Sequence, residues 1–176
     1  MDKQLIPLIS QAEIAATVER LAWEVDRDYH DRRPILVGVL KGSFIFMADL
    51  VRAMQTPIAN IELIRLASYG SSTTSSGQAD LRQGLLNPEI ITDQDVLLVE
   101  DIVDTGVSTT TALAYLQTHQ PASLKLCSFL DKPSRRKQPV AIDYLGLTVP
   151  DRFIVGYGLD CAEYYRQLPA IYALEG

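Results

Sequence analysis

The stretch Val96-Leu-Leu-Val-Glu-Asp-Ile-Val-Asp-Thr-Gly-Val-Ser-Thr-Thr110 decides the fold, because it joins an apolar run to a helix through a polar turn. The unbroken apolar residues 96–99 are typical of a strand covered on both faces, and the residues after Thr110 favour a helix. The turn between them therefore presents backbone N–H groups and the positive end of a helix dipole to solvent. We expect an anion to bind there.

The residues of this turn suit close contact with an anion. Gly106 lets the backbone approach the anion or adopt a left-handed conformation. The hydroxyls of Thr105, Ser108 and Thr109 add hydrogen-bond donors, as does that of the next threonine. A Walker motif would have lysine after the glycine, but Val107 stands there, so the turn is not a Walker loop.

Three carboxylates lie beside the turn, at Glu100, Asp101 and Asp104. They would repel a bare phosphate unless they met sugar hydroxyls or a divalent cation. This combination points to a sugar phosphate, and phosphoribosyl pyrophosphate fits it. The plain alternative is a strand, turn and helix in which the acids merely cap the helix N-terminus.

The segment Val99-Glu-Asp-Ile-Val-Asp-Thr-Gly106 closely resembles the phosphoribosyl pyrophosphate motif of the type I phosphoribosyltransferases, and specifically of the hypoxanthine-guanine phosphoribosyltransferase family. Four more segments resemble the family in the expected order, and together they span most of the chain. They are Leu40-Lys-Gly-Ser43, Ser68-Tyr69 opening a Ser/Thr/Gly tract, Asp131-Lys-Pro-Ser-Arg-Arg136, and Phe153-Ile-Val-Gly-Tyr-Gly-Leu-Asp160 followed by Glu163 and Arg166.

Composition agrees with one globular α/β domain over residues 1–176. The chain has 176 residues, 47% of them hydrophobic, and a formal net charge of −6. This charge argues against nucleic acid or an anionic membrane as the main partner. No apolar stretch approaches the ~20 residues that cross a bilayer, and the N-terminus does not resemble a signal peptide. We therefore expect a cytoplasmic protein with reduced thiols at Cys127 and Cys161.

Periodicity predicts alternating helices and strands, hence a mainly parallel sheet with helices on both faces. A capping box at Ser10 and Glu13 predicts where the first helix begins. The resemblance adds a twisted sheet, a small hood and a flexible loop, as in the type I phosphoribosyltransferase fold. The helices are predicted over residues 10–30, 44–54 and 106–119, and the strands over 35–40, 58–69, 85–91, 95–100, 123–130, 144–149 and 153–157, with a mobile loop over 70–77.

Every one of these motifs follows a predicted strand, and ligands of such sheets bind beyond the carboxyl ends of the strands. Lys41 and Gly42 form a small turn whose amides can cradle pyrophosphate, which is the role of this loop in the family, while Lys41 or Arg166 offsets charge. Taken alone, Lys-Gly-Ser is an ordinary strand-to-helix turn. Val107 departs from relatives that carry lysine in the phosphate loop, so the 5′-phosphate must rely on amides and hydroxyls.

The resemblance also assigns the base site. Lys132 would contact a purine 6-oxo group, Phe153 would stack on the ring, and the Ile154 backbone would meet the ring edge. Asp160 would help Glu100 and Asp101 to hold Mg²⁺. The side chains of Phe153 and Ile154 are equally compatible with core positions. The rest of the basic run, residues 135–137, is expected to be a solvated loop.

The implied reaction transfers ribose 5-phosphate from phosphoribosyl pyrophosphate to a 6-oxopurine, and gives IMP or GMP. Glu100 and Asp101 would bind the ribose hydroxyls directly or through Mg²⁺. Asp104 would act either as general base or as a hydrogen-bonding stabiliser. Ser68 and Tyr69 would begin a lid that excludes water. Family members commonly form homodimers or homotetramers.

Two alternatives stay open. A regulator could keep the sugar-pyrophosphate pocket only as a sensor while it binds RNA or DNA, although the acidic charge argues against this. The second is an enzyme for another base, such as xanthine, adenine or uracil, to which Lys132 and the Phe153-Ile154 pair would be poorly matched. The sequence leaves open the preference among hypoxanthine, guanine and xanthine.

Overall fold

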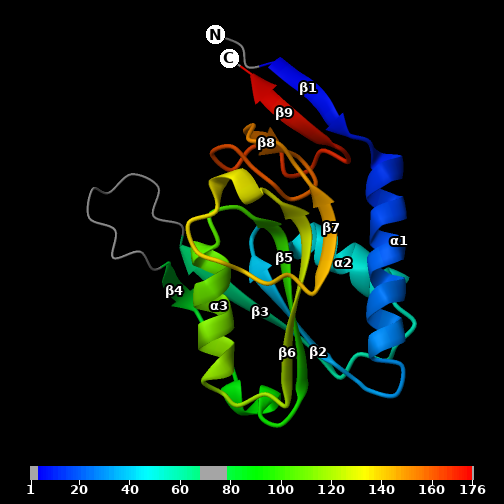
Figure 1. Cartoon of the computed structure of the whole chain (residues 1–176), viewed down its shortest axis with the longest axis vertical. Helices are drawn as coiled ribbons and strands as arrows, with labels where there is room; N and C mark the ends of the chain where they lie inside the picture. Colours follow the sequence, from blue (N-terminus) through cyan, green and yellow to red (C-terminus); the bar gives the residue numbers. More distant parts are fainter. Residues whose placement is uncertain (1–3, 68–78, 176) are drawn as a thin grey trace.

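The computed structural model describes residues 4–67 and 79–175. Its centre is a six-stranded sheet in the order β4-β3-β2-β5-β6-β7 (Figure 1). All neighbouring strands in this sheet are parallel except β3 and β4. The strands are β2 (Ile35–Leu40), β3 (Asn60–Ala67), β4 (Asp80–Gln83), β5 (Asp95–Val103), β6 (Ser123–Asp131) and β7 (Tyr144–Thr148). The predicted α/β class with a mainly parallel sheet is confirmed.

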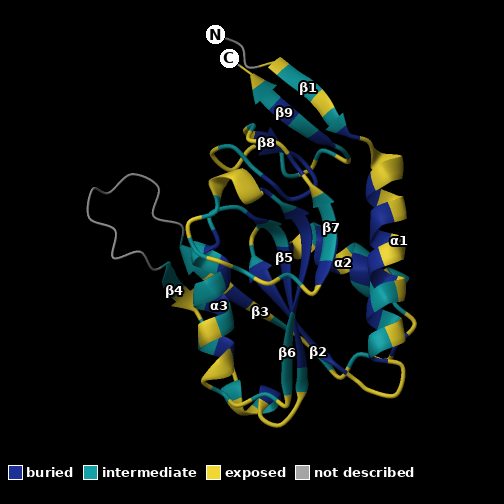
Figure 2. Cartoon of the chain, viewed as in Figure 1, coloured by how far each residue is buried: buried dark blue, intermediate teal, exposed yellow. Residues whose placement is uncertain are grey.

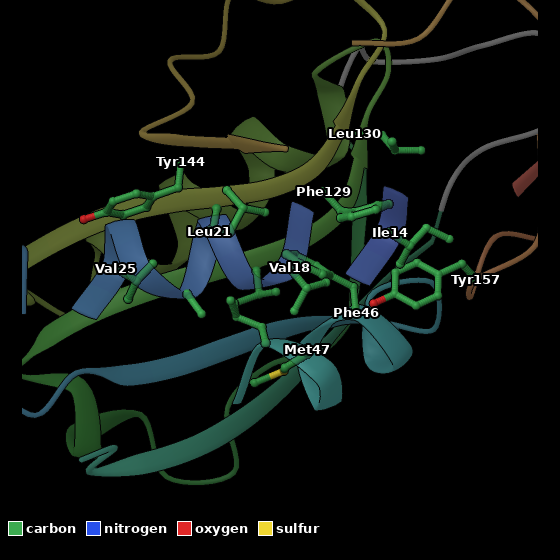
Figure 3. Packing of buried hydrophobic residues seen from close by; sticks show 14 of the residues in the cluster. Ile14, Val18, Leu21, Val25, Phe46, Met47, Phe129, Leu130, Tyr144 and Tyr157 are labelled. Carbon is green, nitrogen blue, oxygen red and sulfur yellow. The ribbon is translucent and has the colours of Figure 1, made fainter. Parts of the chain in front are cut away.

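Helices cover both faces of the sheet, as its buried central strands require. The helices α1 (Gln11–Asp28) and α2 (Phe44–Ala53) pack on one face, and α3 (Val107–Gln117) packs on the other (Figure 1). The buried faces of the helices turn toward the sheet (Figure 2). The hydrophobic core between α1, α2 and the sheet is called the first core here. In it, side chains of α1, α2 and β6 pack together at Leu21, Phe46 and Phe129, all at most 1% exposed (Figure 3).

The first helix begins where the capping box predicts. Ser10 is its N-cap, its hydroxyl accepts the backbone N–H of Glu13 at 3.2 Å, and the Glu13 carboxylate accepts the backbone N–H of Ser10 at 2.8 Å. Two backbone donors that the helix leaves unpaired are thereby satisfied. The apolar residues of this helix from Ile14 to Val25 belong to the first core.

A second sheet of three antiparallel strands stands above the carboxyl ends of the main sheet and forms the hood (Figure 1). Its order is β1-β9-β8, with β1 (Gln4–Ile9), β8 (Ile154–Val155) and β9 (Ile171–Glu175). Strands β1 and β9 pair along their whole length, so the two ends of the chain lie together. Ile9 and Ile171 reach into the same core as α1, which ties the hood to the main sheet.

One predicted strand is wrong. Residues 85–91 do not form a strand; the strand lies earlier, at β4, and Pro88–Ile91 is a short 3-10 helix, η1. Pro88 fixes its own φ and lacks an N–H, and it restricts the residue before it, so a ladder cannot run through this segment. The backbone N–H of Leu85 instead donates to the Tyr115 hydroxyl of α3 at 2.9 Å.

No helix within residues 4–67 and 79–175 is long and apolar enough to span a membrane. Cys127 is buried in β6, and it forms no disulfide with Cys161.

Candidate active site

A cavity of about 1200 Å³ lies between the carboxyl ends of the main strands and the hood. The loops that follow β2 and β5 border it from one side, and the segment around β8 borders it from the other. The predicted site residues that line it come from three of the four described motif segments, and the segment Asp131–Arg136 contributes none. The lining residues are Lys41, Gly42, Glu100, Asp101, Asp104, Thr105, Gly106, Val107, Ser108, Thr109, Phe153, Ile154, Asp160 and Arg166. Ser68 and Tyr69 lie outside the described residues.

The turn after β5 has the backbone that the sequence predicts. Gly106 is the N-cap of α3 with φ +84°, a conformation that favours glycine. A Cβ at this position would lie 2.4 Å from the Gln138 carbonyl oxygen, so space also demands glycine. Within the described residues the N-cap of α3 makes no side-chain capping hydrogen bond, although the Val107 N–H donates to the Thr105 hydroxyl at 3.4 Å. The amides of Val107, Ser108 and Thr109 belong to residues that border the cavity. These amides can bind phosphate oxygens.

Glu100 and Asp101 lie side by side at the end of β5. Glu100 is 4% exposed and accepts a hydrogen bond from the Thr109 hydroxyl at 3.4 Å. Burial raises the pKa of Glu100, and the neighbouring charge of Asp101 raises it further. Burial likewise raises the pKa of Asp101, although two backbone N–H groups oppose this. Because two buried negative charges are costly, this pair is suited to meet a cation or hydroxyl donors.

Asp104 faces a neighbour that the sequence interpretation did not provide. Arg135 Nε lies 3.3 Å from Asp104 Oδ1, and a guanidinium nitrogen of the same arginine lies 4.0 Å from Asp151. Asp104 Oδ1 is itself buried and accepts no hydrogen bond from any residue in the described part of the chain. The charge of Arg135 therefore holds the carboxylate on its buried side, while the side chain as a whole is 36% exposed and borders the cavity.

Arg135 and Lys137 are exposed, as a solvated loop predicts, but the run also contacts the site. Arg135 pairs with Asp104, Arg136 pairs with Asp131, and Lys137 borders the cavity. The backbone N–H groups of Lys137 and Gln138 both donate to the Thr105 carbonyl, at 2.8 and 3.0 Å. The basic run folds back onto the phosphate turn because this carbonyl needs partners, which composition alone does not reveal.

The turn after β2 fits tightly against β5. A Cβ at Gly42 would lie 1.8 Å from Asp101 Oδ2, and one at Gly158 would lie 2.1 Å from the Gly42 carbonyl oxygen. Glycine at both places lets three chain segments converge on one point. The Leu40-Lys41 peptide bond is cis. The Lys41 ammonium points to the hood, where it pairs with Glu163 at 3.0 Å.

Arg166 is embedded among acids and carbonyls of the hood segment. Its guanidinium lies 2.8 Å from Asp160 and 3.3 Å from Glu163, and it donates to the Gly158 carbonyl at 2.7 Å. Its Nε is buried and has no hydrogen-bond partner among the described residues. Asp160 also accepts the backbone N–H of Glu163 at 2.8 Å. This network fixes the hood wall of the cavity.

Glu100, Asp101 and Asp160 do not form a three-acid metal cluster, since the residues that the structure describes contain no group of three side chains placed to hold a metal ion. The Asp160 carboxylate forms an ion pair with Arg166. The adjacent Glu100 and Asp101 remain as a two-carboxylate site open to the cavity.

The base side is assembled in part. Phe153 is 54% exposed and borders the cavity, whereas Ile154 is 6% exposed and borders it from β8. Lys132 is 4% exposed and does not border the cavity. Its ammonium donates to the Arg152 carbonyl at 2.8 Å, and burial lowers its pKa. The Lys132 ammonium is therefore hydrogen-bonded to the carbonyl of the residue that precedes Phe153.

Sequence reasoning missed two cations that border the cavity, Arg65 and Lys137. Arg65 pairs in register with Leu40, so it lies at the carboxyl end of β3. The rule that placed Lys41 at a strand end would have found Arg65 too. Lys137 follows no strand directly, and only its contact with Thr105 brings it there.

Comparison with known proteins adds the family. The family model of the phosphoribosyl transferase domain matches residues 9–162. The chain belongs to this family. Two relatives are named hypoxanthine-guanine phosphoribosyltransferase: the protein of Aquifex aeolicus is 43% identical over 98% of this phosphoribosyltransferase and 96% of its own length. The protein of Bacillus subtilis is 40% identical over 96% and 92%.

Solved structures agree with the fold. The crystal structure of a hypoxanthine-guanine phosphoribosyltransferase from Bacillus anthracis has a TM-score of 0.89 with this phosphoribosyltransferase. It is 38% identical and covers 99% of this chain and 100% of its own. The type I phosphoribosyltransferase fold expected from the motifs is confirmed.

Proposed function

We propose that this phosphoribosyltransferase serves purine salvage and converts hypoxanthine, guanine or both, with phosphoribosyl pyrophosphate, into IMP or GMP and pyrophosphate. One observation carries the proposal: the carboxylates of Glu100, Asp101 and Asp104 and the first turn of α3 border a single cavity. An amide-lined pocket suits a phosphate, and neighbouring carboxylates suit a ribose. The relatives' names supply the base class.

The sugar phosphate would span the cavity from β5 to β2. The turn of Thr105 to Thr109 would hold the 5′-phosphate, and Glu100 with Asp101 would accept hydrogen bonds from the ribose hydroxyls. The amides around Gly42, with Lys41 and Arg166 from either side, would hold the pyrophosphate. The carboxylates also favour the positive charge that develops at the sugar carbon in the transition state.

The residues present fit Mg²⁺ as the cofactor. Mg²⁺ is commonly bound by one or two carboxylates together with substrate oxygens, so it needs no preformed cage. Glu100 and Asp101 provide that number, and their raised pKa values report the unbalanced charge that a cation would relieve. When bound, Mg²⁺ would neutralise pyrophosphate oxygens. Asp160 would contribute only if it released Arg166.

The purine would lie against the hood. Phe153 would stack on the ring, and the Ile154 backbone would meet the ring edge. Asp104, whose side chain is 36% exposed and borders the cavity, would accept the purine N–H. Lys132 would donate to the 6-oxo group after leaving the Arg152 carbonyl, which is one hydrogen bond exchanged for another.

We further infer that residues 1–176 act as one domain, because Ile9 and Ile171 of the hood share the core of α1 and β5. A homodimer or homotetramer in the cytoplasm remains the expectation for this phosphoribosyltransferase.

The test is a screen of hypoxanthine, guanine, xanthine, adenine and uracil with phosphoribosyl pyrophosphate and Mg²⁺. We expect hypoxanthine, guanine or both to give the nucleotide, identified by mass, and adenine and uracil to give none. The variant Asp101→Asn is the matched control for contaminating activity. Absence of any nucleotide, together with a salt-dependent gel shift of RNA or DNA, would establish the sensing regulator instead.

A further inference from the structure

The phosphate turn has no cation of its own. Val107 stands at the position after Gly106, and the turn lies next to Glu100, Asp101 and Asp104. Amides at a helix N-terminus attract an anion, but these carboxylates oppose a doubly charged phosphate at the same place. A positive side chain from another segment would offset them.

The segment between β6 and β7 is fixed against this turn and runs past the start of α3 (Figure 1). Its residues Lys137 and Gln138 donate both backbone N–H groups to the Thr105 carbonyl. The Thr110 hydroxyl is also hydrogen-bonded to the Gln138 side chain. The turn and residues 137–138 therefore form one rigid unit, and the place of Lys137 follows from the main chain.

The other basic side chains around the cavity are engaged or distant. Lys41 and Arg166 pair with hood acids, and Arg135 pairs with Asp104. Arg65 belongs to β3, on the far side of β2 from β5. Lys137 is exposed, borders the cavity next to Thr105 to Thr109, and pairs with no acid among residues 4–67 and 79–175.

We propose that Lys137 supplies the cation for the 5′-phosphate of substrate and product, from outside the phosphate turn. This rests on the proposed function, in which a ribose 5-phosphate occupies the turn. The ammonium is carried on a flexible stem from a fixed backbone, so it closes over the phosphate opposite the α3 amides. The turn therefore needs no lysine of its own, and valine can stand at position 107.

The experiment compares a phosphorylated ligand with its unphosphorylated counterpart. Calorimetry measures the dissociation constants of IMP and inosine for the wild-type protein and for Lys137→Ala. We expect IMP to bind about 5- to 20-fold more weakly to the variant and inosine to bind unchanged, as loss of one partly solvated charge-assisted bond implies. The salt dependence of IMP binding should also become shallower.

Two further variants serve as controls. Lys137→Arg should keep most of the affinity for IMP. Arg33→Ala removes an exposed charge just before β2, at the amino ends of the strands and away from the cavity. It should leave the affinity for both ligands unchanged. Equal weakening of IMP and inosine in Lys137→Ala, or IMP binding as tight as in the wild type, would overturn the proposal.

A second probe, ribose 5-phosphate, separates this proposal from the proposed function. If no base is converted but ribose 5-phosphate binds in a Lys137-dependent way, the purine assignment fails and the phosphate role stands. If bases are converted and Lys137→Ala retains the wild-type affinity for ribose 5-phosphate, the role of Lys137 is refuted. A wild-type protein with no affinity for ribose 5-phosphate would refute it as well.

Discussion

The three carboxylates of the candidate site, Glu100, Asp101 and Asp104, each lie in an environment that makes negative charge costly or holds it in place. Asp104 is held by the charge of Arg135, yet its Oδ1 accepts no hydrogen bond from the described residues. Glu100 and Asp101 are crowded together, and burial raises the pKa of each. Burying negative charge is costly, so a cation or a hydroxyl donor that meets Glu100 and Asp101 gains affinity there.

Asp104→Asn should lower kcat by about 10²- to 10⁴-fold with a modest change in the KM of either substrate, because general-base assistance is lost while binding contacts remain. Steady-state kinetics with the preferred purine measure this. Asp151→Asn removes the other, more distant partner of Arg135 and should keep kcat near that of the wild type. An unchanged kcat in Asp104→Asn would remove Asp104 from the reaction.

Gly42→Ala should lower kcat/KM for phosphoribosyl pyrophosphate by about 100-fold while the melting temperature changes little. The added Cβ meets the end of the Asp101 side chain, which can turn away, but it then leaves its place in the site. The double variant with Asp101→Ala tests the cause. If Gly42 acts through Asp101, Gly42→Ala has little further effect in the Asp101→Ala background; fully additive losses would exclude that route.

At the scale of elements, the sequence predicted the strands and helices that carry the site, because β2, β5 and α3 have unambiguous periodicity and a glycine turn. It missed β1 and β9, whose half-exposed residues become strands only by pairing with each other. It placed a strand at residues 85–91, where Pro88 excludes one.

The site was predictable to the extent that its residues follow strands. The turn of Gly106 and the acids of β5 lie where the pattern put them. Arg135 against Asp104, Lys137 on the turn and Lys132 on the Arg152 carbonyl were not predictable. Each depends on which backbone groups a loop finds after folding, and no local periodicity encodes that choice.

The end of α1 is tied to β6 and β7 by a charged network that makes stability depend on pH. Asp28 accepts hydrogen bonds from Tyr144 at 2.8 Å and Lys125 at 3.1 Å, and these lower its pKa from 3.8 to about 2. The pKa is lower in the folded state, so the stabilisation is present above about pH 4 and is lost as the pH falls toward 2.

Asp28→Asn should therefore lower the free energy of unfolding by about 1–2 kcal/mol at pH 7, and the difference from the wild type should shrink between pH 4 and 2. Urea unfolding at several pH values measures this. Asp31→Asn, a neighbouring position with an 81% exposed side chain, is the control and should differ little from the wild type. A difference that grows in acid would contradict the assignment.

At the scale of the whole molecule, the cavity joins loops of the main sheet to the hood. Lys41 pairs with Glu163 and Gly158 touches Gly42, so the hood segment and the turn after β2 contact each other without ligand. A substrate that contacts both segments should therefore stabilise the folded protein.

Phosphoribosyl pyrophosphate with Mg²⁺, at 100 times its dissociation constant, should raise the melting temperature by about 5–10 °C, since it adds about 2.7 kcal/mol to a chain of this size. With EDTA the shift should be much smaller and turnover should cease, and added Mg²⁺ should restore both. A shift that is as large in EDTA as in Mg²⁺ would show that the carboxylate pair does not hold a cation with the substrate.

The pairing of β1 with β9 also bears on how this protein is made. Residues for the phosphate turn are neighbours along the chain, whereas Ile154 gains its strand partner only when Ala173 is in place. During synthesis from the N-terminus, the segments proposed for the sugar phosphate, β5 and α3, are complete dozens of residues before the β8 segment proposed for the purine has its partner strand. Because β1 and β9 pair across almost the whole chain, they should form late, and pulse-labelled hydrogen exchange should show β5 and α3 protected before β1 and β9.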